Sequence, residues 1–90
     1  MRVLRYTSKF KKDFKRMGKR GADMKKLHTV IQKLANEEEL DARFKDHPLQ
    51  GKFAEAHDCR ISPDWILIYA IAGNELRLIR TGTHSDLFAK

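Results

Sequence analysis

Five polar residues in the second half of the chain have side chains that together could cleave a phosphodiester bond. They are two histidines, two aspartates and one arginine: His47, Asp58, Arg60, Asp64 and His84. An imidazole titrates near neutral pH and can take or give a proton, whereas a guanidinium can hold two phosphate oxygens. Attack by an RNA 2′-hydroxyl needs a base, an acid for the leaving 5′-oxygen, and positive charge near the phosphorus. The residue types therefore suit cleavage of RNA.

Each of these residues also has a structural interpretation, and the sequence alone leaves both open. A turn beside a proline or glycine would account for three of them: His47, Asp64 and His84. Asp58 and Arg60 lie two positions apart in an expected strand, so they share one face and could form an exposed ion pair. Phe88 could anchor the core or could stack on a base.

The remaining histidines and the cysteine give weaker indications. His28 falls near the apolar seam of an expected helix, which favours a structural role. His57 and Cys59 share one strand face with a spacing suited to two metal ligands, but no further paired ligands appear. We therefore expect no metal site.

The first half of the chain must form the elements that support these residues. Residues 2–6 are expected to form a strand, and Thr7 or Ser8 can cap the helix that follows. That helix has Phe10, Phe14 and Met17 on one face and is expected to stop at residues 18–21. A second helix, capped by Asp23, has an apolar seam of four residues: Met24, Leu27, Ile31 and Leu34. The acidic run 37–39 is expected to close it.

The second half is expected to form a loop followed by strands. Residues 42–51 contain a proline and a glycine and predict a loop, and residues 52–61 predict a strand. Residues 65–71 are apolar on both faces, which predicts a buried central strand. Gly73-Asn74 predicts a hairpin turn into a strand at 75–81, followed by a turn or helical tail at 82–90. The order β-α-α-β-β-β predicts one α+β domain over residues 1–90, with a helical hairpin packed on an antiparallel sheet.

Positive charge is concentrated near the start of the chain. The formal net charge is +7, and residues 1–30 contain eleven lysines and arginines against two aspartates. Such a concentration favours a polyanion such as nucleic acid, although it could also be a solubilising helix surface. The cations expected to contact nucleic acid are those of the two helices and the segment between them: Lys9, Lys11, Lys12, Lys15, Arg16, Lys19, Arg20, Lys25 and Lys26.

Other classes of protein are disfavoured by composition. A single cysteine cannot form an internal disulfide, and no apolar run reaches the ~18 residues that a membrane span needs. The first residues lack the apolar stretch of a signal peptide. We therefore expect a small cytoplasmic protein with no membrane partner.

Three segments closely resemble one known family. KDHPLQG at 45–51, PDWILIY at 63–69 and RTGTHSDLF at 80–88 resemble the YafQ branch of the RelE/ParE toxin superfamily, and the likeness covers essentially the whole chain. It implies a RelE-like, microbial-ribonuclease-like fold. It also implies a ribosome-dependent endoribonuclease that cuts mRNA in the A site without metal or cofactor. The 2′-hydroxyl would attack the adjacent phosphate, leaving a 2′,3′-cyclic phosphate and a 5′-hydroxyl. The implied partners are the ribosome, mRNA, an acidic ribbon-helix-helix antitoxin and, through that complex, operator DNA.

The resemblance also assigns roles by position. His47 and His84 match catalytic histidines of the family, Asp58 and Asp64 match carboxylates of its site, and Phe88 matches its near-terminal aromatic residue. The family often has a histidine where this chain has Arg60, which we include as a further member of the candidate site. An arginine cannot exchange protons at neutral pH, so Arg60 is expected to stabilise phosphate charge. The two histidines are then expected to transfer the protons, and the sequence does not decide which of them is the base.

Two other functions remain open from the sequence. A ParE-like toxin that poisons DNA gyrase shares the fold but lacks the histidine-rich site, so His47 and His84 argue against it. A basic RNA-binding module without catalysis would need only the lysines. Mapping of RNA ends in cells that express the protein separates these functions.

Overall fold

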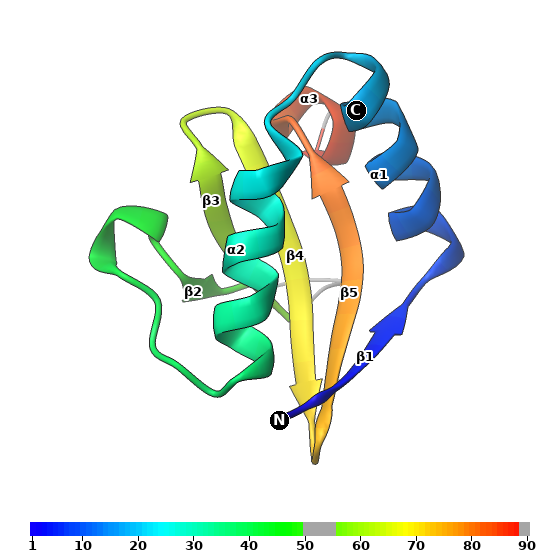
Figure 1. Ribbon diagram of the computed structural model, residues 1–90. Coiled ribbons are helices and arrows are strands. Elements are labelled where there is room, and N and C mark those ends of the chain that lie inside the picture. The colour runs from blue at the N-terminus through cyan, green and yellow to red at the C-terminus, as the bar shows by residue number, and fades with distance from the viewer. Residues whose placement is uncertain (50–55, 89–90) are drawn as a thin grey trace.

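The computed structural model describes residues 1–49 and 56–88 and has one five-stranded sheet with two long helices on one face (Figure 1). The strand order is β1-β5-β4-β3-β2. The elements, in chain order, are β1 (Val3–Tyr6), α1 (Ser8–Lys19), α2 (Met24–Ala35), the 3-10 helix η1 (Ala42–Phe44), β2 (His47–Pro48), β3 (His57–Ser62), β4 (Trp65–Ala72), β5 (Glu75–Gly82) and α3 (His84–Phe88). The predicted α+β class and the predicted order of the main elements are confirmed.

Both long helices begin at the predicted caps. The Thr7 hydroxyl accepts the Phe10 N–H at 3.0 Å, and the Asp23 carboxylate accepts the Lys25 N–H at 3.1 Å. Each side chain satisfies an N–H group that has no partner within the first helical turn. The second helix ends at Ala35, and Glu37 adopts a left-handed conformation with φ 62° just beyond it, so the acidic run does follow the helix end.

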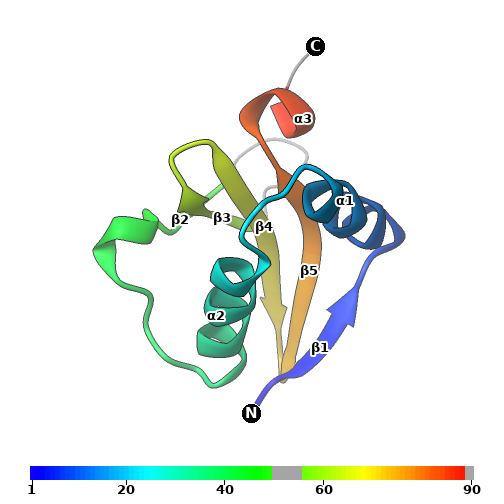
Figure 2. The ribbon, with the colours of Figure 1, turned by 45° about the horizontal axis from the view of Figure 1, so that its top comes forward.

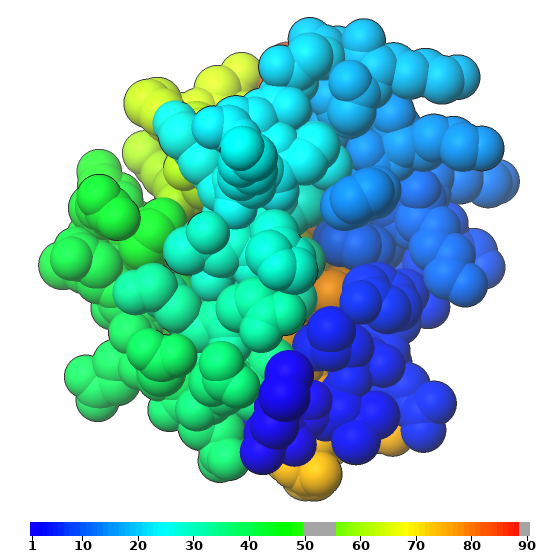
Figure 3. Space-filling model, in the orientation of Figure 1, coloured from blue at the N-terminus to red at the C-terminus, as the bar shows by residue number. Residues whose placement is uncertain are grey.

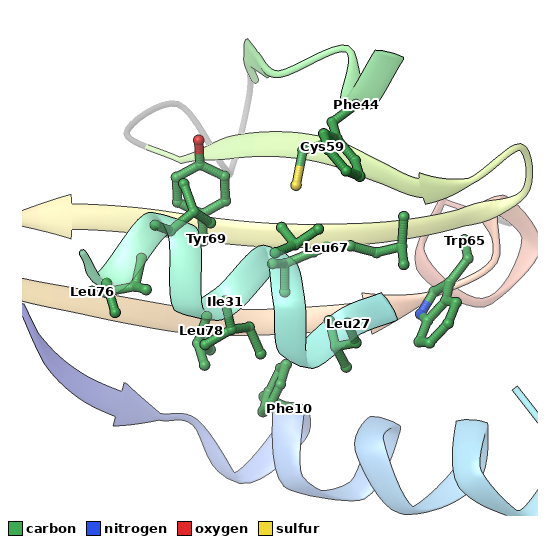
Figure 4. Close-up of a cluster of buried hydrophobic side chains, with 14 of the residues drawn as sticks. Phe10, Leu27, Ile31, Phe44, Cys59, Trp65, Leu67, Tyr69, Leu76 and Leu78 are labelled. Atoms are coloured by element: carbon green, nitrogen blue, oxygen red, sulfur yellow. The ribbon is translucent and has the colours of Figure 1, made fainter. Parts of the chain in front are cut away.

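The main core lies between the helices and the sheet. Figure 2 shows α1 and α2 side by side on the same face, and Figure 4 shows the side chains packed between them and the strands. Leu27 of α2 and Leu67, Leu76 and Leu78 of the central strands are fully buried there. Alternate residues of β4 point to the other face, where a smaller cluster forms around Ile66 and Ile68.

The sheet is mixed, whereas the sequence predicted an antiparallel one. β3, β4 and β5 pair antiparallel as expected, but β1 lies parallel to β5, with Val3 opposite Glu75 and Tyr6 opposite Leu78. The physical reason is that α1 and α2, which follow β1 in the chain, cross one face of the sheet and separate β1 from the other strands in the sequence. β1 therefore joins the sheet beside the last strand, by a pairing that no hairpin turn determines.

The predicted loop and the strand after it differ in detail from the structure. Residues 42–51 were expected to be loop, but they include η1 and the two-residue strand β2, which pairs with β3. The predicted strand at 52–61 appears as β3, beginning at His57, and its residues 52–55 lie outside the described residues. The expected tail contains α3, and residues 89–90 also lie outside the description.

Two predictions about the helical layer are wrong. Phe14 was expected to pack inward with Phe10, but it is 46% exposed, and His28 is exposed rather than set into the apolar seam. Both line an open groove between α2 and the segment formed by β1 and α1, where the space-filling view is hollowed (Figure 3). The groove is mainly apolar, with Leu4, Tyr6 and Met24 among its lining residues. These helices diverge enough to leave one edge of their apolar faces open.

Candidate active site

The pairing of β2 with β3 brings the first two candidate residues together. His47 lies directly opposite Asp58, and its Nε2 is 2.9 Å from Asp58 Oδ1, although the two are not aligned for a hydrogen bond. On the other side of the ring, Nδ1 is 2.8 Å from the Lys45 carbonyl oxygen. A carbonyl can only accept, so Nδ1 carries a proton. In neutral His47 the basic nitrogen is therefore Nε2, on the side of Asp58.

Asp58 is the buried carboxyl of the site. Only 8% of the residue is exposed, and burial raises the pKa of its side chain. The charges of His47, Arg60 and His84 act in the opposite direction, since each favours the carboxylate. Asp58 thus interacts electrostatically with three of the other candidate residues.

Asp64 and His84 form a second pair at one end of the sheet. Asp64 lies in the turn between β3 and β4, and His84 begins α3 directly after β5, at the same end (Figure 1). His84 Nδ1 is 2.8 Å from Asp64 Oδ1, and the His84 N–H donates to the same oxygen at 3.2 Å. The hydrogen bond from the His84 ring, followed by that from its N–H, lowers the pKa of Asp64. The carboxylate therefore orients His84 so that Nε2 is left for proton exchange.

Arg60 and Phe88 complete the candidate set. Arg60 lies opposite Ile66 and Asp58 opposite Ile68, so both project from the sheet face that α1 and α2 leave uncovered. The Phe88 ring is 6.2 Å from the His84 ring and is 41% exposed. An exposed aromatic beside a histidine provides a surface on which a base could stack.

The short helix α3 is held in place mainly by Asp86. Its carboxylate accepts from the Thr83 N–H at 2.9 Å, and the Thr83 hydroxyl accepts from the Asp86 N–H at 3.1 Å. Arg20, which directly follows α1, binds both Asp86 oxygens, at 2.7 and 3.2 Å, and Arg16 of α1 lies 3.8 Å from one of them. The Arg20 hydrogen bond lowers the pKa of Asp86 well below its ordinary value. α1 therefore supports the helix that carries His84 and Phe88.

Sequence reasoning missed the buried carboxylate that joins α1 to β5. Asp13 is 1% exposed and binds Arg80 at 2.8 Å through both oxygens, Arg16 at 2.8 Å and the Thr81 N–H at 3.2 Å. Its position three residues after the buried Phe10 was the available signal, since that spacing places it on the inward face of α1. Charge pairing makes this burial tolerable.

The basic residues fall into two groups. Arg16 and Arg20 are engaged in the ion pairs with Asp13 and Asp86, whereas no lysine in residues 1–49 or 56–88 forms an ion pair. Seven exposed lysines remain from the expected RNA-contacting set: Lys9, Lys11, Lys12, Lys15, Lys19, Lys25 and Lys26. These lysines project from the helical layer and the segment between its helices.

The part of the chain that the structure describes contains no group of three or more histidine, cysteine, aspartate or glutamate side chains arranged to hold a metal ion. Cys59 is fully buried, and burial raises the pKa of its thiol to about 12. His57 stacks on Tyr69, with ring centroids 5.6 Å apart. Over the same ranges, no helix is long and apolar enough to cross a membrane.

Comparison with known proteins gives matches over almost the whole chain. Residues 2–89 match the family model described as the bacterial toxin of type II toxin-antitoxin system, YafQ. The chain is 44% identical over 88 residues to the mRNA interferase toxin YafQ of Escherichia coli K12, covering 97% of this chain and 96% of that protein. The crystal structure of YafQ from E. coli BL21(DE3) is 43% identical, with a TM-score of 0.93 over 98% of this chain and 99% of that one. The structure of the E. coli DinJ-YafQ complex matches with a TM-score of 0.91 at 44% identity, over 98% and 99% of the two chains.

Proposed function

Because the chain belongs to the YafQ family of bacterial toxins from type II toxin–antitoxin systems, we propose that it is an mRNA interferase that inhibits translation. In this proposal the protein enters the ribosomal A site and cuts the mRNA there. The observation that carries it is the matched geometry of two histidines. Each has Nδ1 at 2.8 Å from an oxygen that orients the ring, and each keeps Nε2 on the side away from that oxygen.

The proposed reaction is a transesterification within the RNA strand. One imidazole takes the proton from the 2′-hydroxyl at Nε2, and the freed oxygen attacks the adjacent phosphorus. The bond from phosphorus to the 5′-oxygen breaks, and the second imidazole gives that oxygen a proton from its own Nε2. The products are a 2′,3′-cyclic phosphate and a 5′-hydroxyl. No water, metal or cofactor takes part in this step.

The other candidate residues act on charge and orientation in this proposal. Arg60 neutralises the phosphorane, because a guanidinium can bind two oxygens that gain charge together. Asp64 orients His84 through the 2.8 Å contact between its Oδ1 and His84 Nδ1. The Asp58 carboxylate, with Oδ1 2.9 Å from His47 Nε2, favours positive charge on the His47 ring. Phe88, exposed beside His84, stacks on a base next to the scissile bond.

Partners follow from the same family membership. The E. coli relative forms a complex with DinJ, and we propose a cognate antitoxin for this chain, acidic and of the ribbon-helix-helix class, whose complex binds operator DNA. An acidic partner would complement the exposed lysines of α1 and α2. In this proposal the protein acts on ribosomes in the bacterial cytoplasm.

Mapping of RNA ends in cells that express the chain tests the proposal. Primer extension should show cuts in phase with codons and bearing 5′-hydroxyl ends, and they should disappear in His84→Ala. That variant should keep the wild-type circular dichroism spectrum, since His84 is exposed. Intact mRNA with a supercoiling defect would instead indicate a ParE-like gyrase poison. Intact mRNA with normal supercoiling would indicate a basic RNA-binding module, and either result would reject the interferase.

A further inference from the structure

A concave site that includes Arg60 lies between α2, η1 and the end of β3. It is an open pocket of about 530 Å³. Its lining residues come from all three elements and the turn after β3: Lys26, Thr29, Arg43, Phe44, Lys45, Arg60, Ile61, Ser62 and Pro63. β2 pairs only with the first two residues of β3, so the pocket adjoins the part of that strand edge which β2 leaves unpaired. We call it the basic pocket.

The charged residues that line the basic pocket all have the same sign. They are Lys26, Arg43, Lys45 and Arg60, and no aspartate or glutamate in the part of the chain that the structure describes lines it. Within residues 1–49 and 56–88, none of the four forms an ion pair. Four cations around one pocket repel one another, and a bound anion would remove that repulsion. The charge pattern therefore specifies an anionic ligand.

The floor of the basic pocket strengthens binding of an anion. Phe44 and Ile61 are 8% and 7% exposed, so apolar groups rather than water lie beneath the charges. The Arg43 guanidinium lies over the Phe44 ring, 4.9 Å from its centroid, and this contact restrains a long side chain. Apolar surroundings lower the local dielectric constant and strengthen charge interactions. The Ser62 hydroxyl adds a polar group of the kind that binds phosphate oxygens. The Thr29 hydroxyl already donates to the Lys25 carbonyl oxygen at 2.9 Å.

The basic pocket is continuous with the candidate active site. Arg60 lines the pocket, and its positive charge also favours the ionised form of Asp58. Lys45 lines the pocket, while its carbonyl oxygen holds His47 Nδ1 at 2.8 Å. A strand of RNA with its scissile phosphate at the histidines would therefore pass close to these cations.

We propose that the basic pocket binds a backbone phosphate of RNA adjacent to the one that is cleaved. This inference rests on the proposed function and extends it, because it assigns Lys26, Arg43 and Lys45 to the message rather than to the ribosome. Such a contact fixes the position of the strand without reading its bases. It also orients the scissile phosphate, since neighbouring phosphates are joined through one ribose.

A charge-matched pair of double variants tests the assignment. Lys26→Gln/Arg43→Gln removes two cations from the basic pocket, and Lys33→Gln/Arg77→Gln removes two that do not line it. The probe is a short single-stranded RNA with 2′-O-methyl groups, which cannot be cleaved by 2′-hydroxyl attack. Its affinity is measured by amide chemical shifts at fixed salt, with inorganic phosphate as a separate arm. Circular dichroism checks that both variants fold.

We expect the pocket variant to bind the RNA about tenfold more weakly than wild type, because two cations no longer bind phosphate oxygens, and the control variant to stay within about twofold. In wild type the RNA should shift the amides of Arg43, Lys45 and Ile61. Equal weakening in both variants would overturn the proposal, since it would reflect net charge alone. Shifts at these amides with inorganic phosphate but not with RNA would overturn it as well.

The two proposals fail separately. Because the probe RNA is not cleaved, its binding can be measured whether or not the protein is an interferase. In His84→Ala the RNA should still shift the amides of Arg43, Lys45 and Ile61, since His84 does not line the pocket. Absence of mRNA cuts in cells would reject the interferase and leave the pocket measurement intact.

Discussion

The two histidines are oriented by different acceptors, and this difference makes their roles separable. His47 Nδ1 faces a backbone carbonyl, which is neutral, whereas His84 Nδ1 faces the Asp64 carboxylate, 2.8 Å away. Either ring can act as base when neutral and as acid when protonated. The reaction itself distinguishes them, because only the acid acts on the leaving 5′-oxygen.

A substrate with sulfur in place of that 5′-oxygen identifies the acid. A thiolate leaves without protonation, because its conjugate acid is far stronger than that of an alkoxide. We expect alanine at either histidine to slow cleavage of ordinary mRNA about 10²–10⁴-fold. On the sulfur-substituted message, loss of the acid should cost little, while loss of the base should keep its full effect. Single-turnover cleavage on programmed ribosomes measures both. If the sulfur-substituted message restores cleavage in neither alanine variant, then neither histidine donates a proton to the leaving group.

The two carboxyls of the site should affect stability in opposite directions. Burial raises the pKa of Asp58, so folding favours its protonated form. That contribution to stability is present below the unfolded-state pKa, ordinarily about 3.9, and is lost as pH rises through the folded value. The pKa of Asp64 is lowered, mainly by its hydrogen bond from His84. Its contribution is present above the unfolded-state pKa and is lost as pH falls through the folded value.

Asparagine substitutions measure these signs. At pH 7, Asp58→Asn should be more stable than wild type, with a higher urea midpoint, and Asp64→Asn should be less stable. Both differences in stability should shrink at about pH 3, where these two carboxyls of the wild type are largely protonated in the unfolded state. Asp58→Asn should nevertheless lose activity, because it removes the charge beside His47. A fall in stability for both variants at pH 7 would contradict the burial effect at Asp58.

The short helix α3 depends on contacts with the rest of the fold. Five residues are too few to form a stable helix alone, so its position depends on the Thr83–Asp86 hydrogen bonds and on Arg20. A Cβ at Gly82 would lie only 3.0 Å from Asp86, in a backbone conformation with φ 159°, so the close approach of β5 to α3 needs glycine. Asp86 is thus a positioning residue for His84 and Phe88.

Asp86→Asn should loosen α3 while leaving the main core intact. We expect a fall of about tenfold in cleavage rate, since small misplacement of a catalytic group is costly. The pKa of Asp64, measured by NMR titration, should rise toward its ordinary value as His84 moves away from the carboxylate. Glu75→Gln is the matched control, because Glu75 also binds two arginines, Arg5 and Arg77, but lies far from α3 in the sheet register. Unchanged activity and an unchanged Asp64 pKa in Asp86→Asn would reject this role.

The parts of the fold that local sequence determines were predictable. Helix caps at Thr7 and Asp23, the Gly73-Asn74 turn and the buried strand β4 all follow from short-range preferences. The parallel pairing of β1 and the two-residue strand β2 were not, because they depend on contacts between distant segments. The same holds for the buried position of Asp13, whose partner Arg80 is 67 residues away.

The sequence predicted which residues belong to the candidate site, but it did not predict which of them lie next to one another. Residue chemistry and family motifs pointed to the histidines, aspartates and Arg60, and their catalytic roles stay predictions. Only the register of β2 with β3 places His47 opposite Asp58, and only the fold brings Asp64 to His84. Arg16 and Arg20 were predicted as RNA contacts from charge alone, whereas their ion pairs depend on the position of α3 in the fold.

Most of the unpaired positive charge lies away from the candidate active site. Six of the seven exposed lysines project from the helical layer outside the basic pocket, while Asp58 lies on the opposite face of the sheet. A cation bound near rRNA phosphates releases counterions, so the affinity it contributes falls with salt. This arrangement lets the helical layer hold the ribosome while the other face contacts the message.

Removal of three lysines from α1 should therefore weaken ribosome binding without altering the chemistry. In a His84→Ala background, which keeps the message intact, Lys11→Gln/Lys12→Gln/Lys15→Gln should bind 70S ribosomes more weakly. The slope of log affinity against log salt should become shallower by about 0.9 for each phosphate of duplex rRNA that the variant no longer neutralises. Arg5→Gln/Lys33→Gln/Arg77→Gln, which also removes three positive charges, is the control for net charge. With His84 restored, the triple variant should recover wild-type cleavage at saturating ribosome concentration, because its site is unchanged. A slope equal to that of wild type would show that α1 does not face ribosomal RNA, and the charge of the first thirty residues would then belong to another partner.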